Sequence, residues 1–513
     1  MRIQCKIKSI LFLLLLIIVL KSNAQIYFNN RYNYNGFGGD APSIIAIDSG
    51  YLAAGGSYTS TGISEMGLLR IDSLGNLLWK KSYAKPFHYY YGGYPSSLIQ
   101  TTDGGFAFAS IIEDTLGNDD IIFFRFNKFG DTLWTKQIGT TFFDLGAQCR
   151  QTLDKGFVIV GTKGMSSTNI DATLIKMDSL GNIQWQKNYG GTDEEYGYSV
   201  ELTPDGGYII GSYTKSFGSG DFDTYIVKAD SNGNQQWQKV LGGLYFDAPA
   251  VVKNTADGNY IVGCGKTIFQ LPPGLDQAKI RVLKMNSSGG IIWDKLYGTP
   301  RLAAGANNIH ELPDGSIIVG GLTTDTVNST PVGNGFPQGF ILKLNSLGDS
   351  IWYRNYKKLT GGYSENYLMD IKPTSDDGFV CSGFVSALPP DTPAGQQDAW
   401  IFKVDGCGCL IPNCDSICNY LGVNPVESNN QDLIIYPNPT QSQITIEFNI
   451  FEEKNVSIEI KNILGQVVKS TDNKAFSSGL NKIEIDLSEL SSGLFFAQIQ
   501  IGNKVISKKI IRI

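Results

Sequence analysis

The chain has 513 residues, more than one ordinary domain needs, and a formal net charge of −6. Its 59 glycines, 12% aromatic residues and only 18% charged residues are typical of many short strands joined by tight turns. An acidic surface repels phosphate backbones and anionic lipid, so the composition argues against nucleic-acid and membrane-surface binding.

Residues 1–24 have the pattern of a signal peptide. Basic residues, among them Arg2 and Lys6, precede an apolar run over 10–20 and a small-residue cleavage site at 22–24. The run is shorter than the ~18 residues that a membrane-spanning helix needs. We therefore expect an exported chain that starts at Gln25, carries no transmembrane segment and, having lost four basic residues and no acidic one, has a net charge of −10.

An internal repeat of about 50 residues runs through 25–406. An Asp/Gly turn followed by an apolar strand occurs seven times, from Asp48-Ser49-Gly50-Tyr51 to Asp376-Asp377-Gly378-Phe379. Each repeat predicts a four-stranded antiparallel meander, the blade of a β-propeller. A second element, a strand around a tryptophan, occurs six times, at Trp79, Trp134, Trp185, Trp237, Trp293 and Trp352.

The strand that the last repeat lacks is predicted at the mature N-terminus. Residues 26–32 align with 183–189, which places Phe28 at the position of Trp185. This strand would complete the last repeat and close the ring. We thus predict an all-β fold, a seven-bladed β-propeller, in which Phe28 and the six tryptophans pack between blades.

The spacing Asp-x-x-Gly-x-x-x-Trp, as in Asp72, Gly75 and Trp79, resembles the tryptophan-docking repeat of quinoprotein-type propellers and, more loosely, kelch repeats. The resemblance concerns packing between blades. Dehydrogenases with a quinone cofactor are expected to have a vicinal Cys-Cys pair and eight copies of the repeat, whereas this chain has neither. We therefore predict no cofactor.

A different β pattern begins at residue 434. It opens with Tyr436-Pro437-Asn438-Pro439, has a central turn at Gly465 and a late Leu-x-x-Gly element that ends at Gly493. This order resembles the type A C-terminal sorting domain of the type IX secretion system of Bacteroidetes. The resemblance implies the type IX machinery as a partner and a secreted or outer-membrane cell-surface location. Alternating strands over 434–513 predict a small immunoglobulin-like β-sandwich, which a surface adhesion module would also have.

Cysteines cluster in the predicted linker, residues 407–433. In an exported chain the spacing C-x-C-x4-C-x3-C favours disulfides over zinc, with three possible connectivities. Three other cysteines lie on strand-like segments and are predicted to be buried thiols. The chain has two histidines, which argues against a His-rich metal site, and we predict no metal. The linker cysteines are Cys407, Cys409, Cys414 and Cys418.

The long loops between strands two and three and between repeats should emerge on one face of the ring, where binding residues tend to lie. Three aromatic runs in these loops are the candidate ligand-binding residues. Their rings could stack on sugars, anchor a protein partner or wedge between blades. They are His88, Tyr89, Tyr90 and Tyr91; Phe142, Phe143 and Asp144; and Tyr245, Phe246 and Asp247.

Two functions of different classes remain open. The first is binding of extracellular glycan or protein without catalysis. The second is a polysaccharide hydrolase or lyase that uses acidic residues in the central funnel. No motif such as G-x-S-x-G or H-E-x-x-H occurs, and no carboxylate pair stands out, so no catalytic residue is predicted.

Overall fold

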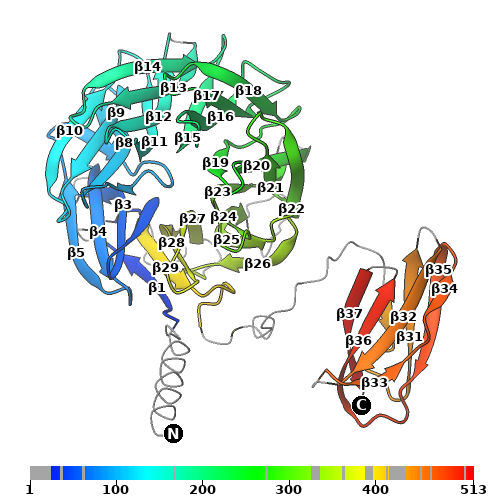
Figure 1. The fold of residues 1–513 in the computed structure, drawn as a ribbon. Helices are drawn as coiled ribbons and strands as arrows, with labels where there is room; N and C mark the ends of the chain where they lie inside the picture. Colours follow the sequence, from blue (N-terminus) through cyan, green and yellow to red (C-terminus); the bar gives the residue numbers. More distant parts are fainter. Residues whose placement is uncertain are drawn as a thin grey trace, which may run out of the picture. The chain divides into compact units, whose positions relative to one another are not determined.

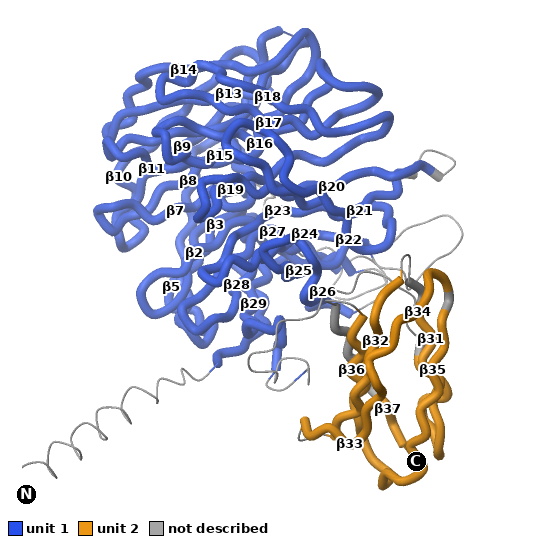
Figure 2. Tube along the Cα trace, turned by 45° about the vertical axis from the view of Figure 1, so that its right-hand side comes forward, with its two compact units in different colours: residues 1–419 blue, residues 420–513 orange. Residues whose placement is uncertain are grey.

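The computed structural model has two compact units, residues 1–419 and 420–513 (Figure 2). It describes residues 25–34, 38–59, 64–166, 168–271, 275–324, 336–360, 364–387, 397–411, 414, 434–450, 453–462, 465–501 and 504–512. The predicted signal peptide, Cys418 and most of the predicted linker lie outside these residues. Among the described residues, no helix is both long enough and apolar enough to span a bilayer.

The first unit consists of antiparallel sheets (Figure 1). The first sheet holds β2 (Ser43–Ile47), β3 (Gly50–Tyr58), β4 (Ser64–Asp72) and β5 (Leu77–Tyr83). The second holds β6 (His88–Tyr91), β7 (Ile99–Gln100), β8 (Phe106–Asp114), β9 (Asp119–Phe126) and β10 (Thr132–Ile138). The third holds β11 (Asp144–Gln151), β12 (Phe157–Gly164), β13 (Ile170–Met177) and β14 (Ile183–Tyr189).

The remaining sheets of this unit repeat the same order. The fourth holds β15 (Glu195–Leu202), β16 (Tyr208–Thr214), β17 (Asp223–Ala229) and β18 (Gln235–Leu241). The fifth holds β19 (Val251–Asn254), β20 (Tyr260–Leu271), β21 (Leu275–Met285) and β22 (Ile291–Arg301), and the sixth β23 (Ala304–Glu311), β24 (Ile317–Thr324), β25 (Pro337–Leu344) and β26 (Ser350–Tyr356). The seventh holds β27 (Ser364–Pro373), β28 (Phe379–Ala387), β29 (Gln397–Val404) and β1 (Phe28–Tyr32).

The first strands of these sheets contact one another in a closed cycle, from β2 through β7, β11, β15, β19, β23 and β27 back to β2. They surround a central axis, with the fourth strands at the rim (Figure 1). This is the architecture of a β-propeller. Because the strands form meanders, the connections from strand two to three and from sheet to sheet lie on one face, here called the upper face. The turns from strand one to two and from three to four lie on the lower face.

The turn between strands three and four explains the recurrent Asp-x-x-Gly signal. In the third sheet the Asp178 carboxylate accepts the N–H groups of Leu180 and Asn182, both at 2.9 Å. Gly181 takes the positive φ (84°) that closes this turn, a conformation that glycine adopts without steric cost.

Each of these turn glycines also lies against an aromatic ring of the preceding sheet. A Cβ on Gly181 would lie 2.8 Å from the Trp134 ring, and one on Gly233 would lie 2.7 Å from the Trp185 ring. Such distances leave no room for a side chain, so the ring and the turn of the next sheet dock only through glycine. The full set of ring and glycine pairs is Phe28 with Gly75, Trp79 with Gly130, Trp134 with Gly181, Trp185 with Gly233, Trp237 with Gly289, Trp293 with Gly348, and Trp352 with Gly408.

The N-terminal strand completes the seventh sheet, as expected. β1 pairs antiparallel with β29, with Phe28 opposite Lys403 and Tyr32 opposite Ala399. Side chains reinforce the pairing, because Trp400 Nε1 donates to Asn29 Oδ1 at 2.7 Å. The first and last segments of the ring are thereby joined in one sheet.

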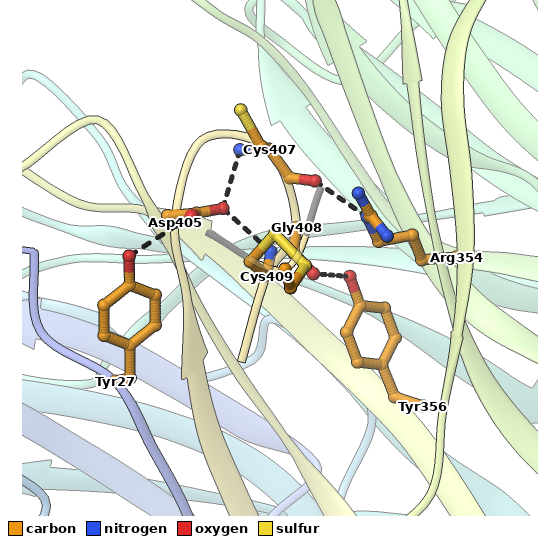
Figure 3. Close-up of a disulfide and its surroundings, with 8 residues drawn as sticks. Tyr27, Arg354, Tyr356, Asp405, Cys407, Gly408 and Cys409 are labelled. Carbon is orange, nitrogen blue, oxygen red and sulfur yellow. Dashed lines mark hydrogen bonds between the residues drawn. A yellow bond between two sulfur atoms is a disulfide. The ribbon is translucent and has the colours of Figure 1, made fainter. Parts of the chain in front are cut away.

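The first two linker cysteines lie in the turn that follows β29 (Figure 3). The Asp405 carboxylate accepts the N–H groups of Cys407 (2.9 Å) and Cys409 (2.8 Å), as Asp178 does in its own turn. Cys409 is joined to Cys414 by a disulfide with a Cα–Cα distance of 5.7 Å, and Cys407 is also disulfide-bonded. The cluster thus forms disulfides and begins inside the last repeat.

The second unit, described by itself, has two sheets around one core. One sheet holds β30 (Ile434–Tyr436), β31 (Gln443–Ile450) and β35 (Gly479–Asp486). The other holds β32 (Lys454–Lys461), β33 (Val467–Ser470), β34 (Lys474–Phe476), β36 (Gly493–Ile501) and β37 (Lys504–Arg512). Alternate residues of β31, β32 and β36, among them Ile446, Ile458 and Ile499, are buried together. The period-two pattern of the sequence therefore marks the inner face of each sheet.

Candidate functional site

The three aromatic runs lie at upper-face positions of three different sheets. His88 to Tyr91 form β6, which pairs with the upper end of β8. Phe142 and Phe143 precede β11, and Tyr245 and Phe246 precede β19. Tyr89 (40%), Tyr91 (48%), Phe142 (41%) and Phe143 (38%) are exposed, whereas His88, Tyr245 and Phe246 are partly exposed.

Three of the candidate residues are instead buried in contacts with the protein itself. Tyr90 packs in the core, with its ring 5.9 Å from that of Phe124. The Asp144 carboxylate accepts the N–H (2.6 Å) and the hydroxyl (2.7 Å) of Thr140, and Asp247 accepts the N–H of Thr267 at 2.8 Å. These two carboxylates hold loops in place, and none of the three side chains is left to face a ligand.

Aromatic rings gather on the upper face at and beside the fourth sheet, as a group of four in mutual contact and a separate pair. Tyr196 and Tyr213 stack with their centroids 5.1 Å apart, and the Phe222 ring meets Tyr213 edge-on at 5.0 Å. Phe246 completes this side, 6.2 Å from both Tyr213 and Phe222. Tyr94 meets Tyr198 edge-on at 5.3 Å. We call Tyr94, Tyr196, Tyr198, Tyr213, Phe222 and Phe246 the aromatic patch.

The aromatic patch combines ring faces with polar groups. Five of its six residues are partly exposed, and Tyr198 is buried beneath them. The Tyr196 hydroxyl donates to Glu194 Oε2 at 3.1 Å, and burial together with this carboxylate raises the pKa of Tyr196 to about 12. The Lys215 ammonium lies 5.6 Å from the Phe222 ring centroid. Rigid rings bordered by hydrogen-bonding groups can stack on a sugar or receive an apolar side chain.

Residues 92–98, the cross-axis segment, run between β6 and β7 and tie sheets together across the central axis. The Ser96 hydroxyl donates to Asp370 Oδ1 of the seventh sheet at 2.9 Å and accepts Asn308 Nδ2 of the sixth at 2.7 Å. Its backbone carbonyl accepts Arg150 of the third sheet at 3.1 Å. Tyr94 of the aromatic patch belongs to this segment, which therefore fixes the inner edge of the patch.

A second polar group lies along the axis, nearer the lower face. It consists of residues at the same position in five consecutive first strands, two residues before the hairpin turn begins: Arg150, Glu201, Lys253, His310 and Lys372. We call it the axial charge cluster. Glu201 Oε2 accepts Lys253 Nζ at 2.6 Å and Arg150 Nε at 3.4 Å, and Lys372 Nζ donates to Asp370 at 3.0 Å.

The carboxylates of this region do not suit general acid catalysis. Burial opposes ionisation of Glu201, but the charges of Lys253 and Arg150 lower its pKa to about 2. Asp370 is fully buried and accepts the N–H of Ile44 at 3.0 Å as well as Ser96 and Lys372. A general acid needs a raised pKa and access to substrate, and Glu201 lacks the first while Asp370 lacks the second. Within the described residues, no group of three or more His, Cys, Asp or Glu is placed to hold a metal ion.

The predicted sorting residues lie at the surface of the second unit. Tyr436 is 40% exposed, its hydroxyl donates to Glu447 Oε2 at 3.0 Å, and Pro437 to Pro439 are exposed. Gly465 takes a positive φ (78°) in the turn before β33, and Gly493 begins β36.

Sequence reasoning missed most of the aromatic patch and all of the axial charge cluster. Phe246 alone was among the candidates. A usable signal existed for the cluster, because ionisable residues recur two positions before the hairpin turns of five successive repeats. No comparable signal marks Tyr94 or Tyr213, since strand tyrosines are common and only the register of β15 and β16 brings Tyr196 and Tyr213 face to face.

Comparison with known proteins identifies the C-terminal segment. Residues 434–513 match the family described as "Secretion system C-terminal sorting domain". The chain therefore carries the signal for export by the type IX secretion system, and it is secreted or displayed at the cell surface.

Similarity over the rest of the chain is weak. A regulatory protein of Caulobacter vibrioides, FlaEY, is 28% identical over 115 residues, which is 20% of this chain. The match spans only 12% of the length of that curated relative. Similar solved structures include a lignostilbene dioxygenase of Pseudomonas brassicacearum (11% identity, 74% of this chain, 93% of that chain, TM-score 0.37) and an endo-arabinase of Bacteroides thetaiotaomicron (12%, 48%, 89%, 0.27). At these scores the likeness carries no argument about function.

Proposed function

We propose that this exported chain is a seven-bladed β-propeller that binds an extracellular ligand, most directly a glycan, through its upper face. In this proposal residues 434–513 are an immunoglobulin-like sorting domain of type A, which directs the propeller through the type IX machinery. The closed cycle of first strands and the seven pairs of ring and glycine support the count of blades.

The observation that carries the binding proposal is the aromatic patch. Water-soluble proteins usually bury aromatic rings, yet here Tyr196, Tyr213, Phe222 and Phe246 remain partly exposed beside one another on one face. The rings are held by mutual contacts, so little side-chain entropy is lost when a ligand binds. Flat rings bordered by Glu194 and Lys215 suit a sugar, whose faces are apolar and whose edges carry hydroxyls. A protein that inserts an apolar side chain would use the same surface.

Tyr89, Tyr91, Phe142 and Phe143 extend this proposal to the neighbouring sheets. They are exposed on the same face. A polymeric ligand that extends across the upper face would contact these four residues as well as the aromatic patch. Tyr90, Asp144 and Asp247 are left out of the proposed surface because they are buried.

Binding without catalysis is favoured over the hydrolase alternative. The axial carboxylates Glu201 and Asp370 are held by cations and hydrogen bonds, so neither is free to act as the acid. Two carboxyl groups with separated pKa values on either side of a sugar are the usual requirement for hydrolysis.

Retention of the mature chain on a panel of insoluble polysaccharides, with reducing-sugar release measured in the same tubes, tests this proposal. We expect retention by at least one polysaccharide and sugar release at background. Tyr213→Ala and Phe222→Ala should each weaken binding by about tenfold or more, as loss of a central aromatic contact does. Tyr353→Ala is the matched control, because this exposed ring stacks on Phe340 in the sixth sheet, outside the patch. Equal retention of all three variants would exclude the aromatic patch as the site.

A further inference from the structure

The axial charge cluster has an excess of cations within an acidic chain. Arg150, Lys253 and Lys372 face two carboxylates, Glu201 and Asp370, while the whole chain carries a net charge of −6. A solvated surface would scatter such charges. Here they converge from three sheets onto one axis, with the cationic side chains only 12–16% exposed.

The two lysines keep hydrogen-bond donors that no described protein group uses. An ammonium has three N–H donors. Lys253 Nζ donates to Glu201, and Lys372 Nζ donates to Asp370 and to the Ser96 hydroxyl. Arg150 differs, because its guanidinium is occupied by Glu201, Gln148 and two backbone carbonyls. The lysines can therefore receive a ligand, and Arg150 adds charge and holds Glu201.

The surrounding groups raise the positive potential at the lysines. Burial and repulsion from Arg150 lower the pKa of Lys253 to about 8, with Lys372 acting in the same direction. The same cations act on His310. Burial, Lys372 and Lys253 lower the pKa of His310 well below its usual value, so its imidazole stays neutral. Glu201, with its two partners, and the buried Asp370 are the carboxylates that face this group. An added anion would relieve the repulsion among the cations.

We propose that the axial charge cluster is a binding site for an oxyanion, bound by the ammonium groups of Lys253 and Lys372. Sulfate, phosphate and carboxylate share this chemistry, and each presents oxygens that accept N–H donors at short range. The group could be a free inorganic anion or the acidic group of a sugar. The site lies on the axis toward the lower face, apart from the aromatic patch, and does not depend on the function proposed for that patch.

Titration calorimetry of the mature chain with sodium sulfate, sodium phosphate and sodium glucuronate near neutral pH tests this inference, with sodium chloride at equal ionic strength as the blank. We expect saturable binding of at least one anion. Lys253→Met should weaken it about tenfold or more, and Lys253→Arg should restore most of the affinity. Lys155→Met is the matched control, because Lys155 is exposed in a lower-face hairpin turn. Tighter binding of glucuronate than of the inorganic anions would identify an acidic sugar as the source.

A pH series on the unmodified chain supplies a second readout that does not rely on a variant. The affinity should fall from about pH 7 to about pH 9, as Lys253 loses its proton. Absence of saturable binding for all three anions would overturn the inference. So would an affinity that neither Lys253→Met nor this change of pH alters.

Discussion

At the scale of single residues, the turn glycines meet two requirements at once. Gly233 takes a φ of 76°, and a Cβ there would lie 2.7 Å from the Trp185 ring and 2.8 Å from Lys187 Cγ. Tyr189, four residues after Trp185, donates its hydroxyl to the Gly233 carbonyl at 2.7 Å. The Trp185 ring and the Tyr189 hydroxyl of β14 therefore both contact the backbone of the next sheet at Gly233. A side chain at Gly233 would displace both.

Gly233→Ala is predicted to destabilise the propeller more than Gly206→Ala does. Both positions have nearly equal φ (76° and 80°), so both variants incur about 1–2 kcal/mol of left-handed strain. A Cβ on Gly206 meets nothing within 4 Å, whereas one on Gly233 overlaps the Trp185 ring, which adds about 1–3 kcal/mol. The denaturant midpoints of the two variants measure this difference in stability. Equal midpoints would show that contact between the Trp185 ring and Gly233 does not stabilise the propeller.

Carboxyl groups at the upper ends of strands predict an unusual dependence of stability on pH. Burial, as the first cause, raises the pKa of Asp40, Asp119, Asp171 and Asp247 to about 6 from an ordinary 3.8. Such a group binds more protons in the folded than in the unfolded state, so its contribution to stability is lost as pH rises through about 6. At Asp171 the charge of the neighbouring Glu195 raises the pKa further.

Carboxyl groups in the lower-face hairpins change the stability in the opposite direction, because their pKa values are lowered. Although burial works against it, a hydrogen bond from Lys228 holds the pKa of Asp205 at about 2, and Asp154 with Lys176 behaves alike. Their contribution is present above about pH 4 and is lost as pH falls toward 2. The denaturant midpoint should therefore be highest at about pH 4 to 5 and lower at about pH 7.

Asp171→Asn should reduce the fall in midpoint between about pH 4.5 and pH 7, because it removes one buried carboxyl that ionises in this range. The Asp171 Oδ1 atom has no hydrogen-bond partner among the described residues, so the amide sacrifices none of these bonds. Asp48→Asn, at an exposed hairpin position, is the control and should leave the profile unchanged. A midpoint that rises steadily to pH 7 in the parent and in both variants would contradict this reasoning.

At the scale of elements, β1 closes the ring. Arg31 donates to Asp398 Oδ2 through Nε at 2.9 Å, and Lys358 Nζ donates to the Asn29 carbonyl at 2.5 Å, so side chains add to the backbone pairing that holds the strand. Removal of residues 25–34 leaves β29 with an unpaired edge.

We predict that removal of residues 25–34 speeds hydrogen exchange in β29 (Gln397–Val404) and lowers the denaturant midpoint, because backbone pairing and the Phe28 contact with Gly75 are both lost. Tyr27→Phe is the control. It removes only a hydroxyl that donates to Asp405 at 3.3 Å and should change exchange little. Unchanged exchange in β29 after the deletion would show that β1 does not close the ring.

The repeat pattern was enough to predict the meanders and the N-terminal strand. Turns and alternating burial depend on residues that are close in the sequence, so they can be predicted from the sequence directly. The repeat pattern did not predict β6, because residues 88–91 were expected in a loop and instead form an additional strand of the second sheet. The cross-axis segment was beyond such reasoning, because Ser96 meets Asn308 and Asp370 across more than 200 positions of chain. The turn Asp405 to Cys409 was missed for another reason: two cysteines replace the usual residues, although the Asp and the Gly408 remain at the repeat spacing.

At the scale of the whole molecule, the chain combines an export signal with a rigid ring whose two faces differ. The upper face carries the aromatic patch, with Glu194 and Lys215 at its border. The lower face carries repeated polar turns with exposed apolar side chains at their tips, such as Leu74, Phe129 and Leu180. We propose that the ligand binds to the upper face and not to the lower face.

Hydroxyl-radical footprinting of the mature chain, with and without the polysaccharide that retains it best, tests that claim most directly. The account predicts reduced oxidation at Tyr196, Tyr213 and Phe222, and unchanged oxidation at Leu74 and Phe129 of the lower face. Protection of the lower-face residues with no change in the aromatic patch would contradict it.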